Sequence, residues 1–467
     1  MPCAAQAQSQ SLAWEKLQAV SPDLEPLGWL KPRHSRDIAS SPWSVGCETL
    51  DRDYADFRVY RDYVGALGVK HARLQSGWAK TEKVRGVYDF AWLDDCVYGL
   101  KQQGVEPWIC ICYGNPLYKS SGGVTTEFNL GAGLLVDEET LAAWCRYVVA
   151  LVSHYKKVVK TWEIWNEPRF SSSAEAYANM LIRTTDAVRS VQPDATVMGF
   201  TVHGFTPNIV LQYPTKVFEI LKAKGRLDVT DYVTYHPYTP NPDESYRMVA
   251  DLEKLVRAYN PALKLYQGES GAPASGTSHR KDPWSEVSQV KWNLRRMAAD
   301  RVRNIPSSIF TIIDLKYPDH LQSMGMIRSN EAHEFVYRRP SYYGVRNMAC
   351  FFDDRVLPVG ELEHQAKSAR QMTVAGFTLE DKPVLLLWYK DRVPGDEIRW
   401  DRVDVRISRV RFRDPVYVEM ITGRAYALGR DTWANAGDDV EFKGLNIWDS
   451  PVMLVERAQV DLMIEPE

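Results

Sequence analysis

Paired cysteines are missing from this sequence. Its seven cysteines are scattered over 467 residues, none lies in a Cys-x-x-Cys pair, and no cysteine–histidine cluster has zinc spacing. An odd number of cysteines also argues against a disulfide framework. We therefore expect no metal and no cofactor, and a fold that depends on its apolar core.

Long apolar runs and basic runs are missing too. No stretch is long enough to cross a bilayer, and no lysine- or arginine-rich stripe points to a nucleic-acid partner. The 57 Lys and Arg residues nearly balance the 60 Asp and Glu residues, which leaves a net charge of −3. Residues 1–10 are small and polar and resemble the cleavage region of a secretory signal that lacks its apolar core. This pattern favours a secreted or periplasmic protein, with a cytoplasmic chain that has a disordered N-terminus as the alternative.

Aromatic side chains, in contrast, are abundant, with 15 Trp and 24 Tyr. They suit core packing and interfaces, and they also suit flat platforms for sugar rings. Their number alone does not decide between the two uses.

From about residue 40, short apolar runs alternate with longer segments of helical period. The expected strands cover residues 43–47, 69–74, 105–112, 161–167, 195–202, 232–236, 263–268 and 307–314. The expected helices cover residues 54–67, 89–103, 137–156, 174–191, 208–224, 244–259, 284–303 and 340–350. Eight such units predict an α/β fold, a closed (β/α)8 TIM barrel over residues 40–352. A doubly wound open sheet is the alternative, but no Gly-x-Gly-x-x-Gly turn follows an early strand.

The pattern changes after residue 352. Short β-type runs separated by Gly, Asp and Pro predict an antiparallel β-sandwich over residues 353–467, and residues 1–39 form an N-terminal segment. We expect the sandwich to support the barrel, with carbohydrate binding as the alternative role.

The run that ends the fourth strand, Trp165-Asn166-Glu167-Pro168, carries the first candidate for chemistry. Pro168 cannot donate to a ladder, so Glu167 falls at the strand's carboxyl end. Aromatic neighbours would desolvate Glu167 and raise its pKa, as a general acid requires. The alternative is a structural, ion-paired glutamate. Glu163 shares its face and is expected to be a paired structural charge.

A second carboxylate, Glu269, ends the seventh strand. Because the carboxyl ends of barrel strands meet at one mouth, we expect Glu167 and Glu269 to face each other. Two carboxylates in an aromatic cleft are typical of glycoside hydrolysis, at a separation of about 5 Å in retaining enzymes and roughly 6.5–9.5 Å in inverting ones. Arg73 and Tyr238 could keep Glu269 ionised, and the glycines at 268 and 271 would leave room for a sugar.

These motifs resemble clan A of the retaining glycoside hydrolases. The similarity rests on Trp165-Asn166-Glu167-Pro168, Gly268-Glu269-Ser270 and His236-x-Tyr238, and the runs at 86–94 and 104–118 narrow it to family 39. The resemblance covers about residues 40–350 and extends to the terminal sandwich. It implies that Glu167 is the acid/base and Glu269 the nucleophile. It further implies sugar-binding or positioning roles for these residues: Arg73, Asn166, His236 and Tyr238.

Three more residues end predicted strands two and three and are candidates for substrate contact: Trp78, Tyr113 and Asn115. Packing suits both aromatic residues equally well, and Asn115 suits a turn. One departure from the clan concerns strand eight, where a Trp usually forms a floor for the sugar. Residues 310–317 contain no Trp and carry Asp314, Lys316 and Tyr317 instead.

The resulting hypothesis is a metal-independent retaining glycosidase that acts on an oligo- or polysaccharide. A non-catalytic carbohydrate-binding protein on a degenerate barrel is the alternative. A metal-dependent barrel hydrolase is a third class, which would need clustered His and Asp ligands where only His203 and His236 come near.

Overall fold

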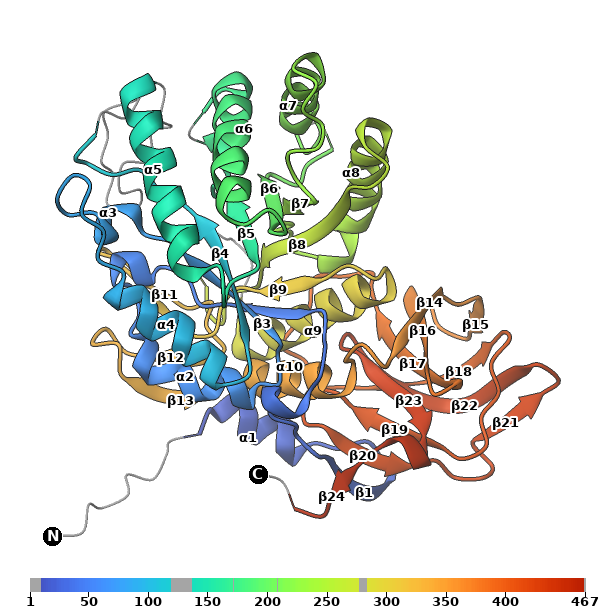
Figure 1. The fold of residues 1–467 in the computed structure, drawn as a ribbon. Coiled ribbons are helices and arrows are strands. Elements are labelled where there is room, and N and C mark those ends of the chain that lie inside the picture. The colour runs from blue at the N-terminus through green and yellow to red at the C-terminus, as the bar shows by residue number, and fades with distance from the viewer. Residues whose placement is uncertain (1–9, 119–136, 171, 208, 277–283, 466–467) are drawn as a thin grey trace, which may run out of the picture.

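The structure is a computed structural model that describes residues 10–118, 137–170, 172–207, 209–276 and 284–465. Eight parallel strands close a barrel, with β2 hydrogen-bonded to both β3 and β9 (Figure 1). The strands are β2 (Trp43–Gly46), β3 (His71–Gln75), β4 (Glu106–Ile111), β5 (Thr161–Ile164), β6 (Thr196–Val202), β7 (Tyr232–Tyr235), β8 (Lys264–Ser270) and β9 (Ser307–Ile309). The predicted TIM barrel is confirmed.

Helices cover the outside of the barrel. They are α2 (Phe57–Ala66), α4 (Ala91–Gln102), α5 (Glu138–Tyr155), α6 (Ala174–Val191), α7 (Gln212–Ala223), α8 (Tyr246–Tyr259), α9 (Glu286–Val302) and α10 (Pro340–Phe351). Several begin at a side chain that accepts a backbone N–H, such as Asp56, Asp137 and Ser173. The helix expected from residue 208 starts at Gln212, and Asn208 itself lies outside the described residues.

Strand eight is shorter than predicted. The expected strand ran from residue 307 to residue 314, but β9 ends at Ile309. Beyond Ile309 the chain pairs with an insertion, residues 315–338, that precedes α10. The Thr311 N–H donates to the Met324 carbonyl at 3.4 Å, and Ile313 bridges Ile327. Two hairpins complete the insertion, β10 (Leu315–Lys316) with β11 (Leu321–Gln322) and β12 (Ile327–Ser329) with β13 (Phe335–Arg338).

The C-terminal region is the expected antiparallel sandwich. One sheet has the order β14-β16-β17-β23-β19-β20-β1-β24 and the other β15-β18-β22-β21. The bounds are β1 (Glu25–Leu30), β14 (Leu357–Glu361), β15 (His364–Ala366), β16 (Met372–Leu379), β17 (Lys382–Tyr389), β18 (Asp401–Ile407), β19 (Pro415–Glu419), β20 (Arg424–Ala427), β21 (Trp433–Ala436), β22 (Asp439–Ile447), β23 (Val452–Glu456) and β24 (Leu462–Met463). Strand β1 comes from the N-terminal segment and pairs with β20 and β24.

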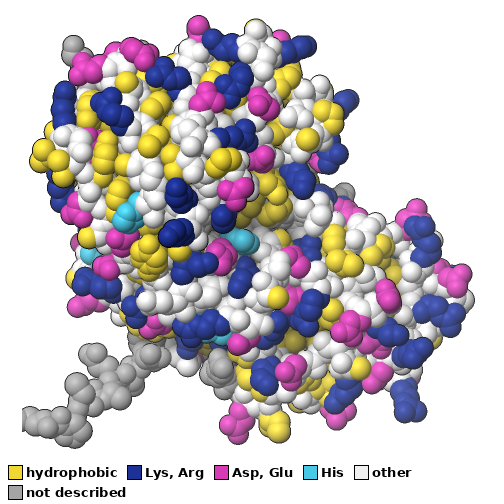
Figure 2. All heavy atoms as spheres, viewed as in Figure 1, with side chains coloured by type: hydrophobic (Ala, Val, Ile, Leu, Met, Phe, Trp, Pro, Cys, Tyr) yellow, Lys and Arg dark blue, Asp and Glu magenta, His cyan; other side chains and the backbone are white. Residues whose placement is uncertain are grey.

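Short elements fill the connections: α1 (Leu12–Ala19), α3 (Trp78–Thr81), and the 3-10 turns η1 (Ser35–Asp37), η2 (Leu50–Arg52), η3 (Pro168–Phe170), η4 (Pro242–Ser245) and η5 (Arg457–Gln459). Helix α9 is buried along its length because it packs between the barrel and the sandwich. Within the part of the chain that is described, no helix is both long and apolar enough to cross a bilayer. Charges of both signs are interspersed on the face drawn in Figure 2.

Candidate active site

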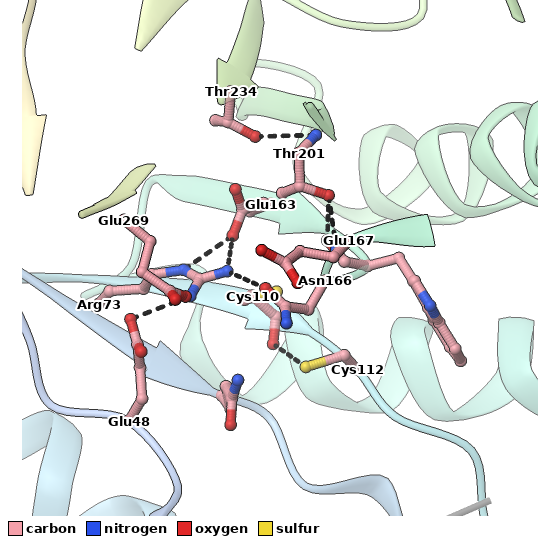
Figure 3. A network of polar contacts seen from close by, with 12 residues as sticks. Glu48, Arg73, Cys110, Cys112, Glu163, Asn166, Glu167, Thr201, Thr234 and Glu269 are labelled. Atoms are coloured by element: carbon pink, nitrogen blue, oxygen red, sulfur yellow. Dashed lines mark hydrogen bonds and ion pairs between the residues drawn. The ribbon is translucent and has the colours of Figure 1, made fainter. Parts of the chain in front are cut away.

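The carboxyl ends of the barrel strands bring a cluster of charged and polar side chains together (Figure 3). Its members are Glu48 after β2, Arg73 in β3, Glu163 in β5, Asn166 and Glu167 just beyond β5, His236 and Tyr238 beyond β7, and Glu269 in β8. Six of the nine residues proposed from the sequence as catalytic or substrate-binding are in this cluster, and Tyr113 joins it through Asn166.

Both oxygens of Glu269 accept a hydrogen bond. Arg73 Nη1 donates to Oε2 at 2.7 Å, and the Tyr238 hydroxyl donates to Oε1 at 2.8 Å. The Glu269 side chain keeps 13% of its surface exposed, so it can be reached from the barrel mouth. A carboxylate held by a permanent cation and a phenol, yet open on one side, has the surroundings expected of a nucleophile.

Glu167 pairs with a histidine. Its Oε1 lies 2.9 Å from His236 Nδ1. Burial alone would raise the pKa of Glu167, but the hydrogen bond and charge of His236 lower it below its usual value. Burial would likewise lower the pKa of His236, and the charges of Glu269 and Glu167 raise it instead. The expectation that dry surroundings raise the pKa of Glu167 is therefore wrong for the free protein, because the sequence did not show that His236 would contact it.

The two carboxylates are close to each other. One oxygen of Glu167, one of Glu269 and a ring nitrogen of His236 all lie within 4.8 Å of one another. Such a spacing matches the separation of about 5 Å found in retaining glycosidases and is shorter than the roughly 6.5–9.5 Å of inverting ones. These three side chains could also ligate a metal ion, but hydrogen bonds already engage both oxygens of Glu269, Oε1 of Glu167 and Nδ1 of His236.

Backbone geometry aims Glu167 into the mouth. Trp165 and Glu167 both have positive φ, 67° and 45°, which non-glycine residues seldom adopt. Thr201 stabilises this turn, since its hydroxyl accepts from the Glu167 N–H at 2.8 Å. Thr201 stands at a register shift in β6, and its own N–H donates to the Thr234 hydroxyl at 3.2 Å (Figure 3).

Arg73 is the hub of the cluster and is completely buried. Besides Glu269, Nη1 donates to Glu48 Oε1 at 2.9 Å. Glu163 Oε2 accepts from Nε at 2.9 Å and from Nη2 at 2.6 Å, which agrees with the expected paired structural charge. Burial would lower the pKa of Arg73, whereas Glu163 and Glu48 hold it well above its usual range. The indole ring of Trp108 packs against Arg73, with its ring centre 5.4 Å from the guanidinium carbon.

Asn166 has a fixed amide orientation. Its Oδ1 accepts from Arg73 Nη2 at 2.9 Å, and its Nδ2 donates to the Tyr113 hydroxyl at 2.8 Å. Tyr113 in turn packs edge-on against Trp165 and lies under the Arg52 guanidinium, 5.1 Å from the ring centre. The expected sugar contact of Asn166 thus lies beside the carboxylate pair, and Tyr113 supports it.

Trp78 and Asn115 lie elsewhere. Trp78 is fully buried, stacks on Tyr118 with ring centres 5.0 Å apart, and donates from its indole nitrogen to Glu82. Asn115 Nδ2 donates to the Glu82 carbonyl at 2.8 Å, and its Oδ1 accepts from the Leu117 N–H. Trp78 therefore packs in the interior and Asn115 stabilises a turn, as the alternative interpretations of these residues predicted.

The segment after β9, the eighth barrel strand, holds no Trp. Its residues Asp314 and Tyr317 have different surroundings. Asp314 forms a buried two-pronged ion pair with Arg339, at 2.6 and 2.8 Å. Burial, together with the charges of Glu269 and Glu48, raises the pKa of Tyr317 to about 12. Its ring packs on Tyr54, with ring centres 4.6 Å apart. The charges of both Glu269 and Glu48 thus reach Tyr317.

The two glycines near Glu269, Gly268 and Gly271, allow close packing inside the barrel. A Cβ on Gly271 would lie 2.0 Å from the Phe310 carbonyl oxygen, and one on Gly268 would lie 3.3 Å from His236 Nε2 and 3.4 Å from Glu163 Oε1. The space expected for a sugar is therefore used for close packing within the barrel.

Glu48 is the member of the cluster that the sequence analysis missed. It follows β2 by two residues, so the rule that found Glu269 at the end of its strand could have found it. Burial raises the pKa of Glu48 to about 8, which the opposing charge of Arg73 does not offset.

Comparison with known proteins places this fold. No protein-family model and no curated protein matches the chain. Among solved structures, it is similar to glycoside hydrolases of families 39 and 30, whose barrel and sandwich it shares. A family 39 enzyme from the gut symbiont Bacteroides cellulosilyticus matches at 17% identity with a TM-score of 0.64, over 89% of this chain and 81% of that chain.

Two further structures show the same likeness. A monomeric β-xylosidase from Caulobacter crescentus matches at 16% identity with a TM-score of 0.60, over 92% of this chain and 98% of that one. A family 30 endoxylanase from Clostridium papyrosolvens matches at 13% identity with a TM-score of 0.57, over 93% and 98%. At such identities the likeness is one of fold, and it agrees with the family 39 resemblance of the sequence motifs.

Proposed function

We propose that this protein is a retaining glycoside hydrolase that cleaves a β-type glycosidic bond, or its equatorial equivalent, in an oligo- or polysaccharide. The observation that carries the proposal is the carboxylate pair: oxygens of Glu167 and Glu269 lie within 4.8 Å of each other at the carboxyl ends of β5 and β8. Their different partners, His236 for one and Arg73 with Tyr238 for the other, support two different roles.

In the first step, a Glu269 oxygen attacks the anomeric carbon and forms a glycosyl ester while the glycosidic C–O bond breaks. Glu167 donates its proton to the departing oxygen, which leaves as an alcohol. In the free protein this proton belongs to the Glu167–His236 pair, whose polar atoms are 2.9 Å apart. In the second step, water attacks the anomeric carbon, Glu167 takes a proton from that water, and the ester bond to Glu269 breaks.

Proton NMR of the first-formed product tests the proposal. The fold neighbours are described as a β-xylosidase and an endoxylanase, so aryl β-xylosides and xylan are the first substrates to try, followed by other aryl glycosides. Double displacement predicts a product that retains the β configuration before it mutarotates. An α product would contradict it.

Two outcomes would support other classes of protein. Sugar binding without turnover, surviving Glu167→Gln and Glu269→Gln, would indicate a non-catalytic carbohydrate-binding protein. Loss of turnover on chelation would indicate a metal-dependent hydrolase. A secreted or periplasmic location stays a prediction from the N-terminal sequence.

A further inference from the structure

We propose that Glu48 is a positioning residue for the nucleophile: it carries a proton in the free enzyme and, as a neutral acid, fixes the Arg73 side chain beneath Glu269. This inference rests on the proposed function, because Glu269 is taken to be the nucleophile. Neither the carboxylate pair nor its two steps requires Glu48.

The geometry places Glu48 and Glu269 on one nitrogen atom. Arg73 Nη1 donates to Glu48 Oε1 at 2.9 Å and to Glu269 Oε2 at 2.7 Å. The Glu48 side chain is 1% exposed and the Arg73 side chain is completely buried, so water does not screen the two carboxylates from each other. Like charges that share one donor in a dry site favour binding of a proton by one of them.

The charges around Arg73 do not balance unless protons are bound. Among the residues described there, four carboxyl groups (Glu48, Glu163, Glu167 and Glu269) face two cations, Arg73 and the His236 imidazolium. Arg52 brings no surplus charge, because Asp51 lies 3.4 Å from it. In the free enzyme the proton of the Glu167–His236 pair makes the imidazolium, and one more proton on Glu48 lowers the excess of negative charge from two to one. Buried unpaired charges are costly, so this distribution is favoured.

Glu48 is the carboxyl group best suited to hold that proton. Glu163 accepts two hydrogen bonds from Arg73, and Glu269 accepts one each from Arg73 and Tyr238, whereas within the described chain Glu48 accepts one side-chain hydrogen bond. An aromatic ring lies close to it: a Cβ on Gly46 would touch both the Glu48 carboxyl group, at 3.2 Å, and the Phe310 ring, at 3.5 Å. Burial raises the pKa of Glu48 to about 8, which agrees with the geometry.

The other titratable groups that face Glu48 do not change this assignment. They are Cys47 after β2, Tyr60 in α2, His236 and Tyr238 after β7, and Tyr317 after β10. Burial raises the pKa of the thiol and of the three phenols, so these four stay neutral. The imidazolium of His236 favours ionisation of Glu48, but burial outweighs it.

A neutral Glu48 accepts from Arg73 without competing for its charge. Ionised Glu48 would draw Nη1 away from Glu269 and loosen the nucleophile. We therefore expect Glu48→Gln, which keeps a neutral acceptor, to retain kcat within about threefold below pH 7. Glu48→Ala removes the acceptor and should lower kcat by about 100-fold with little change in KM, because Arg73 and Glu269 lose their alignment. At alkaline pH the activity of the wild-type enzyme should fall as Glu48 loses its proton, and the activity of Glu48→Gln should not show this fall.

Infrared spectroscopy tests the proton directly and needs no substrate. The wild-type protein should show the C=O stretch of a protonated carboxylic acid that is absent in Glu48→Gln and that disappears as pH rises past about 8. Glu419→Gln is the matched control, since Glu419 is a buried carboxyl group of the sandwich that accepts from the Ile421 and Thr422 N–H groups. The Glu48 band should persist in that variant.

Two results would overturn the inference: no band lost in Glu48→Gln, or a Glu48→Gln enzyme as impaired as Glu48→Ala below about pH 7. If Glu48→Gln does not fold, carbon-13 NMR of glutamate carboxyl groups in the wild-type protein gives the same decision. A carboxyl group titrating near 8 supports the inference, and complete ionisation by about pH 7 contradicts it. If turnover is absent but the band is present, the proposed function has failed and the protonated Glu48 remains.

Discussion

Glu167 and His236 together hold the proton that the first chemical step consumes. The imidazolium keeps that proton next to the acid at 2.9 Å, and Glu269 stabilises the imidazolium from 3.9 Å. Because the pKa of His236 is raised above 6.5, the pair keeps its proton to higher pH than a free imidazole would and loses it as pH rises through that raised value. The same shift stabilises the fold fully below pH 6.5, and this contribution also disappears as pH rises through the folded-state pKa.

Replacing the imidazole should therefore change the pH profile. In His236→Asn the largest opposition to the burial of Glu167 is lost, so the pKa of Glu167 should rise from its lowered value. The alkaline limb of kcat/KM should then report Glu167 alone in place of the pair with its raised imidazole pKa, and should move to lower pH. His154→Asn is the control, because His154 pairs with Asp94 on the outside of the barrel. Identical alkaline limbs for wild-type and His236→Asn enzymes would contradict the proposed proton pair.

Gly268 makes a second residue-scale test. Its missing side chain leaves space for His236 Nε2 and Glu163 Oε1, and a methyl group there would lie 3.3 and 3.4 Å from them. Gly268→Ala should push His236 from Glu167 and lower kcat by about 10- to 100-fold. Gly395→Ala is the control, since nothing lies within 4 Å of its Cβ position. Equal kcat values for the two variants would show that this packing does not position His236.

At the scale of elements, the segment after strand eight departs most from expectation. It leaves the barrel at Ile309 and turns Asp314 inward to Arg339, whose side chain is 4% exposed. Asp314 also accepts from the Gly325 N–H at 3.0 Å, so one carboxylate joins the segment, its insertion and the residue before α10. Asp314 therefore supports the fold, while the pKa of Tyr317 is raised by burial and by the charges of Glu269 and Glu48.

Removing one partner of this pair should unfold the protein more easily. Asp314→Asn removes the two-pronged partner of the buried Arg339 charge and leaves Glu286, 3.2 Å from its Nε, as the remaining carboxylate described there. Breaking a buried pair typically costs about 3–5 kcal/mol of the free energy of unfolding. Asp194→Asn is the matched control: Asp194 pairs with Lys160 at 3.3 Å, but their side chains are 73% and 61% exposed. That variant should lose less than about 1 kcal/mol. Equal losses in urea unfolding would refute the structural role of Asp314.

At the scale of the whole molecule, α9 joins the barrel to the sandwich. Lys291 reaches Asp449 at 2.7 Å, and Arg295 donates from Nε to Asp243 at 2.7 Å and from Nη1 to the Arg392 carbonyl at 2.9 Å. Lys291 and Arg295 are buried, so these contacts lie in the layer between the two parts. The sandwich should therefore unfold together with the barrel.

The Arg295→Leu variant tests this coupling. It leaves Asp243 buried without its cation and should lower the free energy of unfolding by about 3–5 kcal/mol. Hydrogen exchange in increasing urea should show peptides of β17 and of the barrel strands losing protection at one midpoint, in wild-type and variant alike. Loss of protection in β17 at lower urea than in the barrel would contradict a single cooperative unit.

The sequence predicted the barrel well because period and strand-end residues are local signals. Helical spacing, glycine stops and apolar strands identified all eight units, and the strand-end rule identified Glu167 and Glu269. It could not predict β1, because Glu25–Leu30 contains Pro and Gly and becomes a strand only through its partners β20 and β24. The division at residues 39 and 352 stays a proposal, and β1 shows that the N-terminal segment contributes to the sandwich sheet.

The sequence predicted most residues of the site, but not how these residues shift one another's pKa values. Arg73, Asn166, His236 and Tyr238 were expected and lie around the two carboxylates. The sign of the Glu167 pKa shift and the presence of Glu48 were missed, since both depend on which side chains meet across the barrel. The residues adjacent in sequence indicate whether a side chain is buried, but side chains on other strands determine whether it is charged.

Trapping the covalent intermediate tests the central claim most directly. An activated 2-deoxy-2-fluoro β-xyloside, or the matching derivative of whichever sugar is turned over, should label the protein once, because the fluorine slows hydrolysis of the ester more than its formation. Peptide mass mapping should place the label on Glu269, and Glu269→Gln should abolish it. A label on Glu167 or Glu48, or turnover of the parent glycoside with inversion and no label, would contradict the account.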